Sequence, residues 1–255
     1  MTLTLTPLSG IPLIQSGDNL TDVILQACGF ENLELANGDI LVLAQKIVSK
    51  SEGRLVNLTT VIPSPEAETL AAATEKDPRL VALILRESKR VLRSRSGLII
   101  AEHKLGFVCA NAGIDHSNVS GEWGDHADWV LLLPENPDQS ASNLRTALET
   151  KTGKKLGVMI IDSHGRAWRN GTVGVCIGLA GIPGLVDLRG EKDLFDYEMR
   201  VTEVGAADEL AAAASLVMGQ VAEGTPVVHV RGFPYELRES SLGELIRPKE
   251  KDLFR

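Results

Sequence analysis

One short stretch, residues 158–171, holds the side chains best suited to chemistry. Its apolar start ends at Asp162, whose carboxylate supplies the hard oxygen ligands that Mg²⁺, Mn²⁺ and Ca²⁺ prefer. Arg166 and Arg169 follow, and their planar guanidinium groups suit carboxylates and phosphates. We expect a buried strand that delivers Asp162 to its end, then a cationic loop that holds an anionic substrate beside a divalent cation. A strand end with a solvated turn would account for Asp162, but not for the two arginines around Trp168.

A second candidate site contains Asp115 and Asn118, in a turn-rich segment that follows the apolar residues 106–110. Both side chains could face one ligand, and the amide of Asn118 offers a donor and an acceptor to a base, ribose or phosphate. On these residues alone, an Asx turn in which Asp115 bonds its own backbone is the stronger interpretation. Together with Asp162, however, Asp115 makes a joint cation site at two strand ends easier to expect than either residue alone.

Lys46 and Lys50 flank the end of a predicted buried strand, residues 39–48, and lysine can act as a point charge on phosphate. An ordinary surface role is the alternative for both. The common nucleotide signatures are missing: the chain has no G-x-x-x-x-G-K-[ST] and no G-x-G-x-x-G after a strand. The glycine-rich residues 178–184 are more typical of close backbone packing. Any nucleotide site must therefore be unconventional.

The elements that would position these residues mix strands and helices without strict alternation. We predict a mixed α/β (α+β) fold rather than a doubly wound one. No repeat or linker divides the chain, so we treat residues 1–255 as one unit with a charged, peripheral tail over residues 236–255. The predicted strands are residues 2–8, 39–48, 98–102, 106–110, 128–133, 155–161 and 225–230. The predicted helices are residues 19–29, 65–92 with a break at 77–78, 140–150 and 203–218.

The composition excludes several classes of protein. A net charge of −8 over 255 residues argues against general nucleic-acid binding. The first residues have no signal-peptide pattern, and no run approaches the roughly 18 apolar residues of a membrane span. The three cysteines are far apart, which fits neither a disulfide framework nor a zinc site. We expect a cytoplasmic protein that binds small molecules.

Five segments in order, spread between Gly10 and about Gly232, together resemble the coenzyme F-420:γ-glutamyl ligase family. The third and fourth are long enough to be specific. The resemblance implies a ligase that uses GTP to join L-glutamate to the deazaflavin precursor F-420-0 and to extend it by γ-linked residues, through an acyl phosphate. It also implies an intertwined homodimer with a family-specific fold, neither Rossmann nor P-loop. The five segments are residues 10–14, 45–54, 112–118, 161–171, and 201–204 with 207–209.

The resemblance also implies roles for individual residues. Asp115 and Asp162 would hold one divalent cation, Mg²⁺ or Mn²⁺, while Ser163 and Gln220 would serve a second; K⁺ is a further candidate ion. The residues implied for GTP are Ile11, Pro12, Leu13, Ile14, Gln45, Lys46, Lys50 and Asn118. As catalytic residues we select Lys50, Asp115, Asp162, Arg166 and Arg169, the two arginines by our own inference for the acceptor phosphodiester or the glutamate carboxylates.

The resemblance leaves alternatives open. No general base is evident, and for His116 and His164 a turn-stabilising role is the stronger expectation. We expect no fused flavin reductase domain, which some bacterial members of the family carry. A related nucleotide-dependent amide ligase acting on another carboxylic acid would keep the same metal and nucleotide residues. A non-catalytic binder of nucleotide or deazaflavin is the third possibility, and the joint presence of Asp115, Asp162 and Lys50 argues against it.

Overall fold

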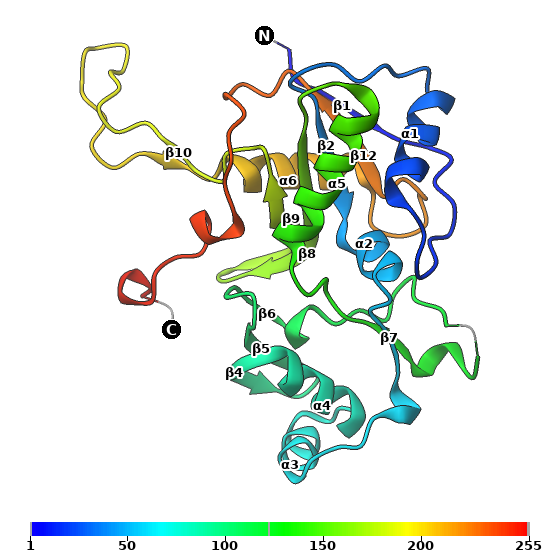
Figure 1. The fold of residues 1–255 in the computed structure, drawn as a ribbon. Coiled ribbons are helices and arrows are strands. Elements are labelled where there is room, and N and C mark those ends of the chain that lie inside the picture. Colours follow the sequence, from blue (N-terminus) through cyan, green and yellow to red (C-terminus); the bar gives the residue numbers. More distant parts are fainter. Residues whose placement is uncertain (1, 122, 254–255) are drawn as a thin grey trace.

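The most apolar runs of the chain form the middle of a five-stranded sheet in the computed structural model, which describes residues 2–121 and 123–253. The strand order is β1-β12-β2-β8-β9 (Figure 1). Only β2 and β8 are parallel; the other neighbours are antiparallel. The bounds are β1 Thr4–Pro7, β2 Ile40–Ala44, β8 Gly157–Arg166, β9 Arg169–Ala180 and β12 Val227–Arg231.

Helices cover both faces of this sheet. Two of them, α1 (Leu20–Phe30) and α5 (Pro137–Thr152), share a buried cluster with one face, and α6 (Ala206–Met218) shares a second cluster with the other. Glycines on β9 permit the contact with α6, because a Cβ on Gly174 would lie 2.4 Å from the carbonyl oxygen of Ala211. The close packing expected of residues 178–184 is confirmed at Gly178, where a Cβ would lie 2.4 Å from Cβ of Pro137 on α5.

A smaller unit lies below the main sheet in Figure 1 and has its own apolar cluster. Its helices are α3 (Pro65–Thr74) and α4 (Pro78–Glu87), and a three-stranded sheet follows them: β4 (Ser88–Arg95), β5 (Leu98–His103) and β6 (Val108–Ala110). The short helix α2 (Gln45–Ser51) and the strand pair β3 (Leu55–Asn57) and β7 (Trp129–Leu131) connect this unit to the main sheet.

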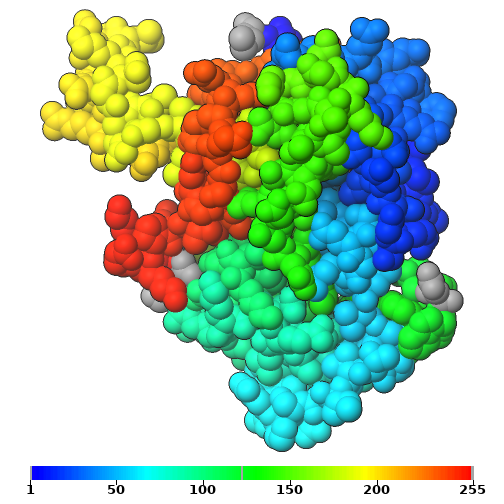
Figure 2. Space-filling model, in the orientation of Figure 1, coloured from blue at the N-terminus to red at the C-terminus, as the bar shows by residue number. Residues whose placement is uncertain are grey.

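A third region is an arm, residues 186–204, whose base is the strand pair β10 (Val186–Asp187) and β11 (Glu203–Val204). Figure 2 shows the arm, in yellow, standing away from the rest of the surface. The chain then passes through α6 and β12, and its final segment returns along the sheet, where Leu242 is buried in the cluster that α6 shares.

The structure confirms the mixed α/β class and corrects several boundaries. Residues 203–204 of the predicted helix 203–218 form β11, and the helix begins at Ala206. The predicted strand 39–48 ends at Ala44, where α2 begins. The predicted helix 65–92 ends at Glu87, because residues 88–95 pair with β5 as a strand. The predicted strand 155–161 continues through Asp162 to Arg166 and turns directly into β9. Among the described residues, no helix is long and apolar enough to cross a membrane.

Candidate functional site

The two carboxylates predicted from the sequence meet at one edge of the main sheet. The parallel strands β2 and β8 are in register, with Ala44 opposite Ile161, so Asp162 lies one residue beyond the end of β2. The chain of β2 turns at that point into α2, whose first residue is Gln45. Carboxyl ends of parallel strands are a common place for ligand sites. Asp162 is therefore a residue inside a long strand, not the end of one as predicted.

Asp115 reaches the same place from the loop after β6. Its backbone exchanges two hydrogen bonds with Leu131 of β7, at 3.0 and 2.9 Å. Its carboxylate accepts a hydrogen bond of 2.7 Å from Nε2 of Gln45 and lies 3.5 Å from Nζ of Lys46. The sequence alone favoured an Asx turn, in which Asp115 bonds its own backbone. In the structure its carboxylate bonds instead to side chains of α2.

The electrostatics of the pair fit a bound cation. Burial, together with the negative charge of Asp162, raises the pKa of Asp115 to about 6, against the weaker opposing effects of Lys46 and Gln45. Burial and then the charge of Asp162 also raise the pKa of the Cys109 thiol to about 12. A divalent cation between the carboxylates would offset this mutual repulsion. Asp115 and Asp162 therefore fit the divalent ion that the sequence implied.

The protein alone supplies few ligands. Among residues 2–121 and 123–253, no group of three or more His, Cys, Asp or Glu side chains is arranged to hold a metal. Mg²⁺ commonly uses one or two carboxylates and completes its shell with water and substrate phosphates. A Mg²⁺ ion held by Asp115 and Asp162 would therefore take its remaining ligands from water and substrate.

Lys46 and Lys50 share one face of α2, because they are four residues apart on a helix rather than on a strand. Nζ of Lys46 donates to the carbonyl and hydroxyl of Ser117, at 2.9 and 2.7 Å. Nζ of Lys50 donates to the carbonyl of Asn118 at 2.7 Å, and burial with the nearby charge of Lys46 lowers its pKa. The two lysines thus hold the loop that follows Asp115.

Ser163 and Gln220 meet on the opposite face of β8 from Asp162, since side chains alternate along a strand. Oγ of Ser163 donates to Oε1 of Gln220 at 3.0 Å, and Nε2 of Gln220 donates to Oγ of Ser215 at 2.9 Å. The loop of Gln220 also touches the Asp115 side, because Nδ2 of Asn118 donates to the carbonyl of Val221 at 2.8 Å. Ser163, Gln220 and Asn118, which were all predicted as site residues, therefore lie close to β8 or to the loop of Gln220.

Two predicted groups lie apart from this centre. Arg166 and Arg169 are paired at the tip of the β8–β9 hairpin, where Trp168 is 88% exposed and has a φ of +66°. Nη1 of Arg166 is buried and has no hydrogen-bond partner among the described residues. The loop 11–14 lies instead toward the far end of α2, where the N–H of Gly17 donates to the carbonyl of Ser51 at 2.8 Å.

His164 was expected to stabilise a turn, and this prediction was wrong. It lies on β8 with its Nε2 3.0 Å from Oδ2 of Asp162. The signal was present in the sequence, because residues two apart on a strand point to the same face. Phe107, which packs against the ring of His164 at a centroid distance of 5.2 Å, could not be found from the sequence, since nothing local links the two.

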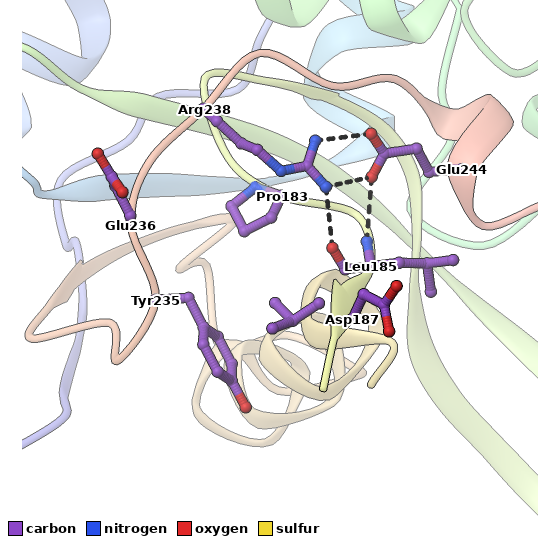
Figure 3. Close-up of a pocket in the computed structure, with 8 residues that line it drawn as sticks. Pro183, Leu185, Asp187, Tyr235, Glu236, Arg238 and Glu244 are labelled. Atoms are coloured by element: carbon purple, nitrogen blue, oxygen red, sulfur yellow. Dashed lines mark hydrogen bonds and ion pairs between the residues drawn. The ribbon is translucent and has the colours of Figure 1, made fainter. Parts of the chain in front are cut away.

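A separate pocket of about 450 Å³ lies at the base of the arm (Figure 3). Arg238 lines it and donates to Glu244 at 2.7 and 2.8 Å and to the carbonyl of Leu185 at 2.9 Å. Its lining contains none of the residues predicted to bind substrate or metal. The lining residues are Pro183, Leu185, Val186, Asp187, Tyr235, Glu236, Arg238 and Glu244.

Comparison with known proteins agrees with the resemblance seen in the sequence. A family model described as F420-0:Gamma-glutamyl ligase matches residues 10–232. The chain is 44% identical to the coenzyme F420:L-glutamate ligase of Methanothermobacter thermautotrophicus, over the full length of both chains. It is also 44% identical to the enzyme of that name from Methanocaldococcus jannaschii, over 96% of this chain and 94% of the relative. The chain therefore belongs to the F420-0:gamma-glutamyl ligase family.

Proposed function

We propose that this chain joins L-glutamate to a coenzyme F420 precursor through an amide bond, using GTP and an acyl phosphate. A carboxylate oxygen of the acceptor would attack the γ-phosphorus of GTP and release GDP. The glutamate amine would then attack the acyl carbon, so that a carbon–nitrogen bond forms, inorganic phosphate leaves and the amine loses a proton. The observation that carries the proposal is the pair of partly buried carboxylates, Asp115 and Asp162, beside the lysines of α2.

The roles of the residues follow from their charges. Asp115 and Asp162 would hold Mg²⁺ or Mn²⁺, and Ser163 with Gln220, on the other face of β8, would serve a second ion. Such ions neutralise phosphate charge during phosphoryl transfer. K⁺ beside the phosphates belongs to the same proposal, to be tested by replacing it with Na⁺ in the assay.

The cationic and amide side chains near α2 would bind the nucleotide. Lys50 is partly desolvated, so its charge acts more strongly on a phosphate than that of an exposed lysine. Lys46, Gln45 and Asn118 lie where α2 contacts the loop that follows Asp115, and they would bind the nucleotide there. The main chain of residues 11–14 would complete the GTP site from the far end of α2. Arg166 and Arg169, at the hairpin tip, would meet the phosphodiester of the acceptor or the carboxylates of glutamate.

Exposed apolar side chains on the arm support a homodimer. Leu194, Phe195 and Val201 are 98%, 89% and 85% exposed on a segment that projects from the surface (Figure 2). Exposed apolar groups gathered in this way mark an association surface. We expect light scattering to give a dimer for the chain and a monomer for the double variant Leu194→Ser, Phe195→Ser. Glu198→Gln on the same arm is the control, and a monomeric unaltered chain would contradict the proposal.

Mass spectrometry of a reaction containing deazaflavin precursor, L-glutamate, GTP and Mn²⁺ tests the activity. A product heavier by one or more glutamyl units, with GDP released only when both substrates are present, supports the ligase. GTP binding without addition would redirect the proposal to another carboxylic acid. The absence of both GTP binding and glutamate addition would overturn the proposal. ATP in place of GTP measures the nucleotide preference.

A further inference from the structure

We propose that His164 is a positioning residue that fixes the carboxylate of Asp162 for cation binding, and that Phe107 of the smaller unit holds His164 in place. The inference rests on the proposed function, because it presupposes a cation at Asp115 and Asp162. It assigns a role to a histidine that contacts neither the nucleotide residues nor the lysines described above.

The chemistry of the two groups sets the direction of the hydrogen bond between Asp162 and His164. Asp162 and His164 are two residues apart on β8, and their side chains are 12% and 10% exposed. An ionised carboxylate only accepts, so Nε2–H of His164 donates to Oδ2 across 3.0 Å. Among the described residues, Oδ1 of Asp162 has no hydrogen-bond partner. The contact thus occupies one oxygen and leaves the other available to a cation.

The ring of His164 is held from its other side by the turn between β5 and β6. Phe107 packs on His164 with an interplanar angle of 54° and stacks on His103 with an angle of 9°, both at 5.2 Å. Within the turn, the N–H of His103 donates to the carbonyl of Phe107 at 2.9 Å, and Nδ1 of His103 accepts from the N–H of Leu105 at 3.0 Å. Phe107 also packs against both clusters of the main sheet, so it cannot easily move away from His164.

This arrangement argues for positioning rather than proton transfer. A general base must present a free nitrogen to the proton that it removes. Nε2 of His164 is engaged by Asp162, so only Nδ1 could take up a proton, and the side chain as a whole is nine-tenths buried. Partners that orient a metal ligand typically change metal affinity by about 10- to 100-fold when they are removed. His164 is placed as such a partner, because it would act on the cation through the carboxylate of Asp162 and would not contact the substrate.

Mn²⁺ binding, measured by electron paramagnetic resonance with GTP present, tests the proposal without relying on turnover. His164→Leu keeps the bulk but removes the donor, so we expect Mn²⁺ to bind about 10- to 100-fold more weakly. His164→Gln keeps an N–H donor at a similar reach, so its affinity should stay within a few-fold of the unaltered chain. Phe107→Ala should weaken binding more than Phe107→Leu, which retains an apolar contact. Thermal unfolding of each variant establishes that it is folded.

The outcomes separate the possibilities. Saturating Mn²⁺ should restore most of the turnover of His164→Leu if the histidine only positions Asp162. Equal Mn²⁺ affinity in all the variants, with turnover lost in both His164→Leu and His164→Gln, would overturn positioning in favour of a general base. Equal affinity and equal turnover would assign His164 to packing alone. If the unaltered chain binds no Mn²⁺ in the presence of GTP, the cation site of the proposed function fails, and this inference fails with it.

Discussion

Asp162 and Asp115 face one site, yet the structure supports them in different ways. Asp162 lies within β8, a central strand of the main sheet that pairs with β9 on both sides of this residue. Asp115 follows a short turn in the smaller unit, and an isolated bridge to Leu131 fixes its backbone. Its side chain depends on Gln45 and Lys46, which belong to α2.

The two aspartates therefore differ in what their surroundings control: the position of the side chain for Asp162, and the ionisation of the carboxyl group for Asp115. The sheet fixes where Asp162 stands, and a single hydrogen bond from His164 orients its carboxylate. Asp115 instead has a raised pKa, so neighbouring groups determine how readily it ionises. We infer that Asp162 provides the fixed half of the site and Asp115 the half that responds to pH and to α2. The following predictions test this distinction, from the largest expected effect to the smallest.

Asp162→Asn should have the largest effect on activity. The substitution keeps the shape and the hydrogen bond from His164 but removes the charge that a cation needs. Loss of several kcal/mol of charge stabilisation corresponds to a fall in turnover of at least about a hundredfold. Steady-state kinetics with saturating Mn²⁺ measures the loss. Asp22→Asn, a surface carboxylate on α1, is the control, and unchanged turnover in Asp162→Asn would rule out the cation site.

Asp115→Asn should stabilise the cation-free chain at pH 8 while weakening Mn²⁺ binding. The folded pKa of about 6 lies above the ordinary value of 3.8 for an aspartate, so the folded state binds more protons between these values. The neutral form therefore adds stability below about pH 4, and this contribution is lost as the pH rises through 6. Removing the charge should raise the unfolding free energy by about 1–3 kcal/mol at pH 8, and by little at pH 4. Thermal unfolding in a chelator measures both values.

Lys46→Met should change the pH dependence of Mn²⁺ binding more than its strength. The positive charge of Lys46 lowers the pKa of Asp115, so its removal should leave Asp115 more protonated at pH 6. At pH 8, where Asp115 is ionised in either chain, removal of a competing cation should strengthen Mn²⁺ binding measured without GTP. We expect a few-fold loss at pH 6 and a few-fold gain at pH 8. An equal effect at both pH values would contradict the role given to Asp115.

The pairing of the two carboxylates could be anticipated from the sequence, because each follows an apolar run. Their approach depends on the parallel pairing of β2 with β8, a contact between residues far apart in the chain. The same limit explains the error at residues 88–95. Charged and apolar residues there fit a helix face as well as a strand, and pairing with β5 decides between them.

The start of α2 shows a second reason why the structure could not be fully predicted from the sequence. Ile47 and Val48 continue the apolar run of β2, so periodicity favoured a longer strand. In the structure both residues are buried on a helix, and Ser49 and Gln45 are linked four residues apart, at 2.9 Å. Tertiary packing therefore overrides local preference at the point where the site begins.

Ser49→Ala should give the smallest effect and tests how the Asp115 side is built. Oγ of Ser49 donates to Oε1 of Gln45, which turns Nε2 of Gln45 toward Asp115. Removing this buried hydrogen bond should cost about 0.5–1.5 kcal/mol of unfolding free energy. Because Lys46 still contacts Asp115, Mn²⁺ affinity at pH 8 should fall by no more than a few-fold. Denaturant unfolding and Mn²⁺ titration measure the two effects. A loss as large as that expected for His164→Leu would show that both carboxylates depend equally on one oriented donor, and the distinction between a fixed and an adjustable half would fail.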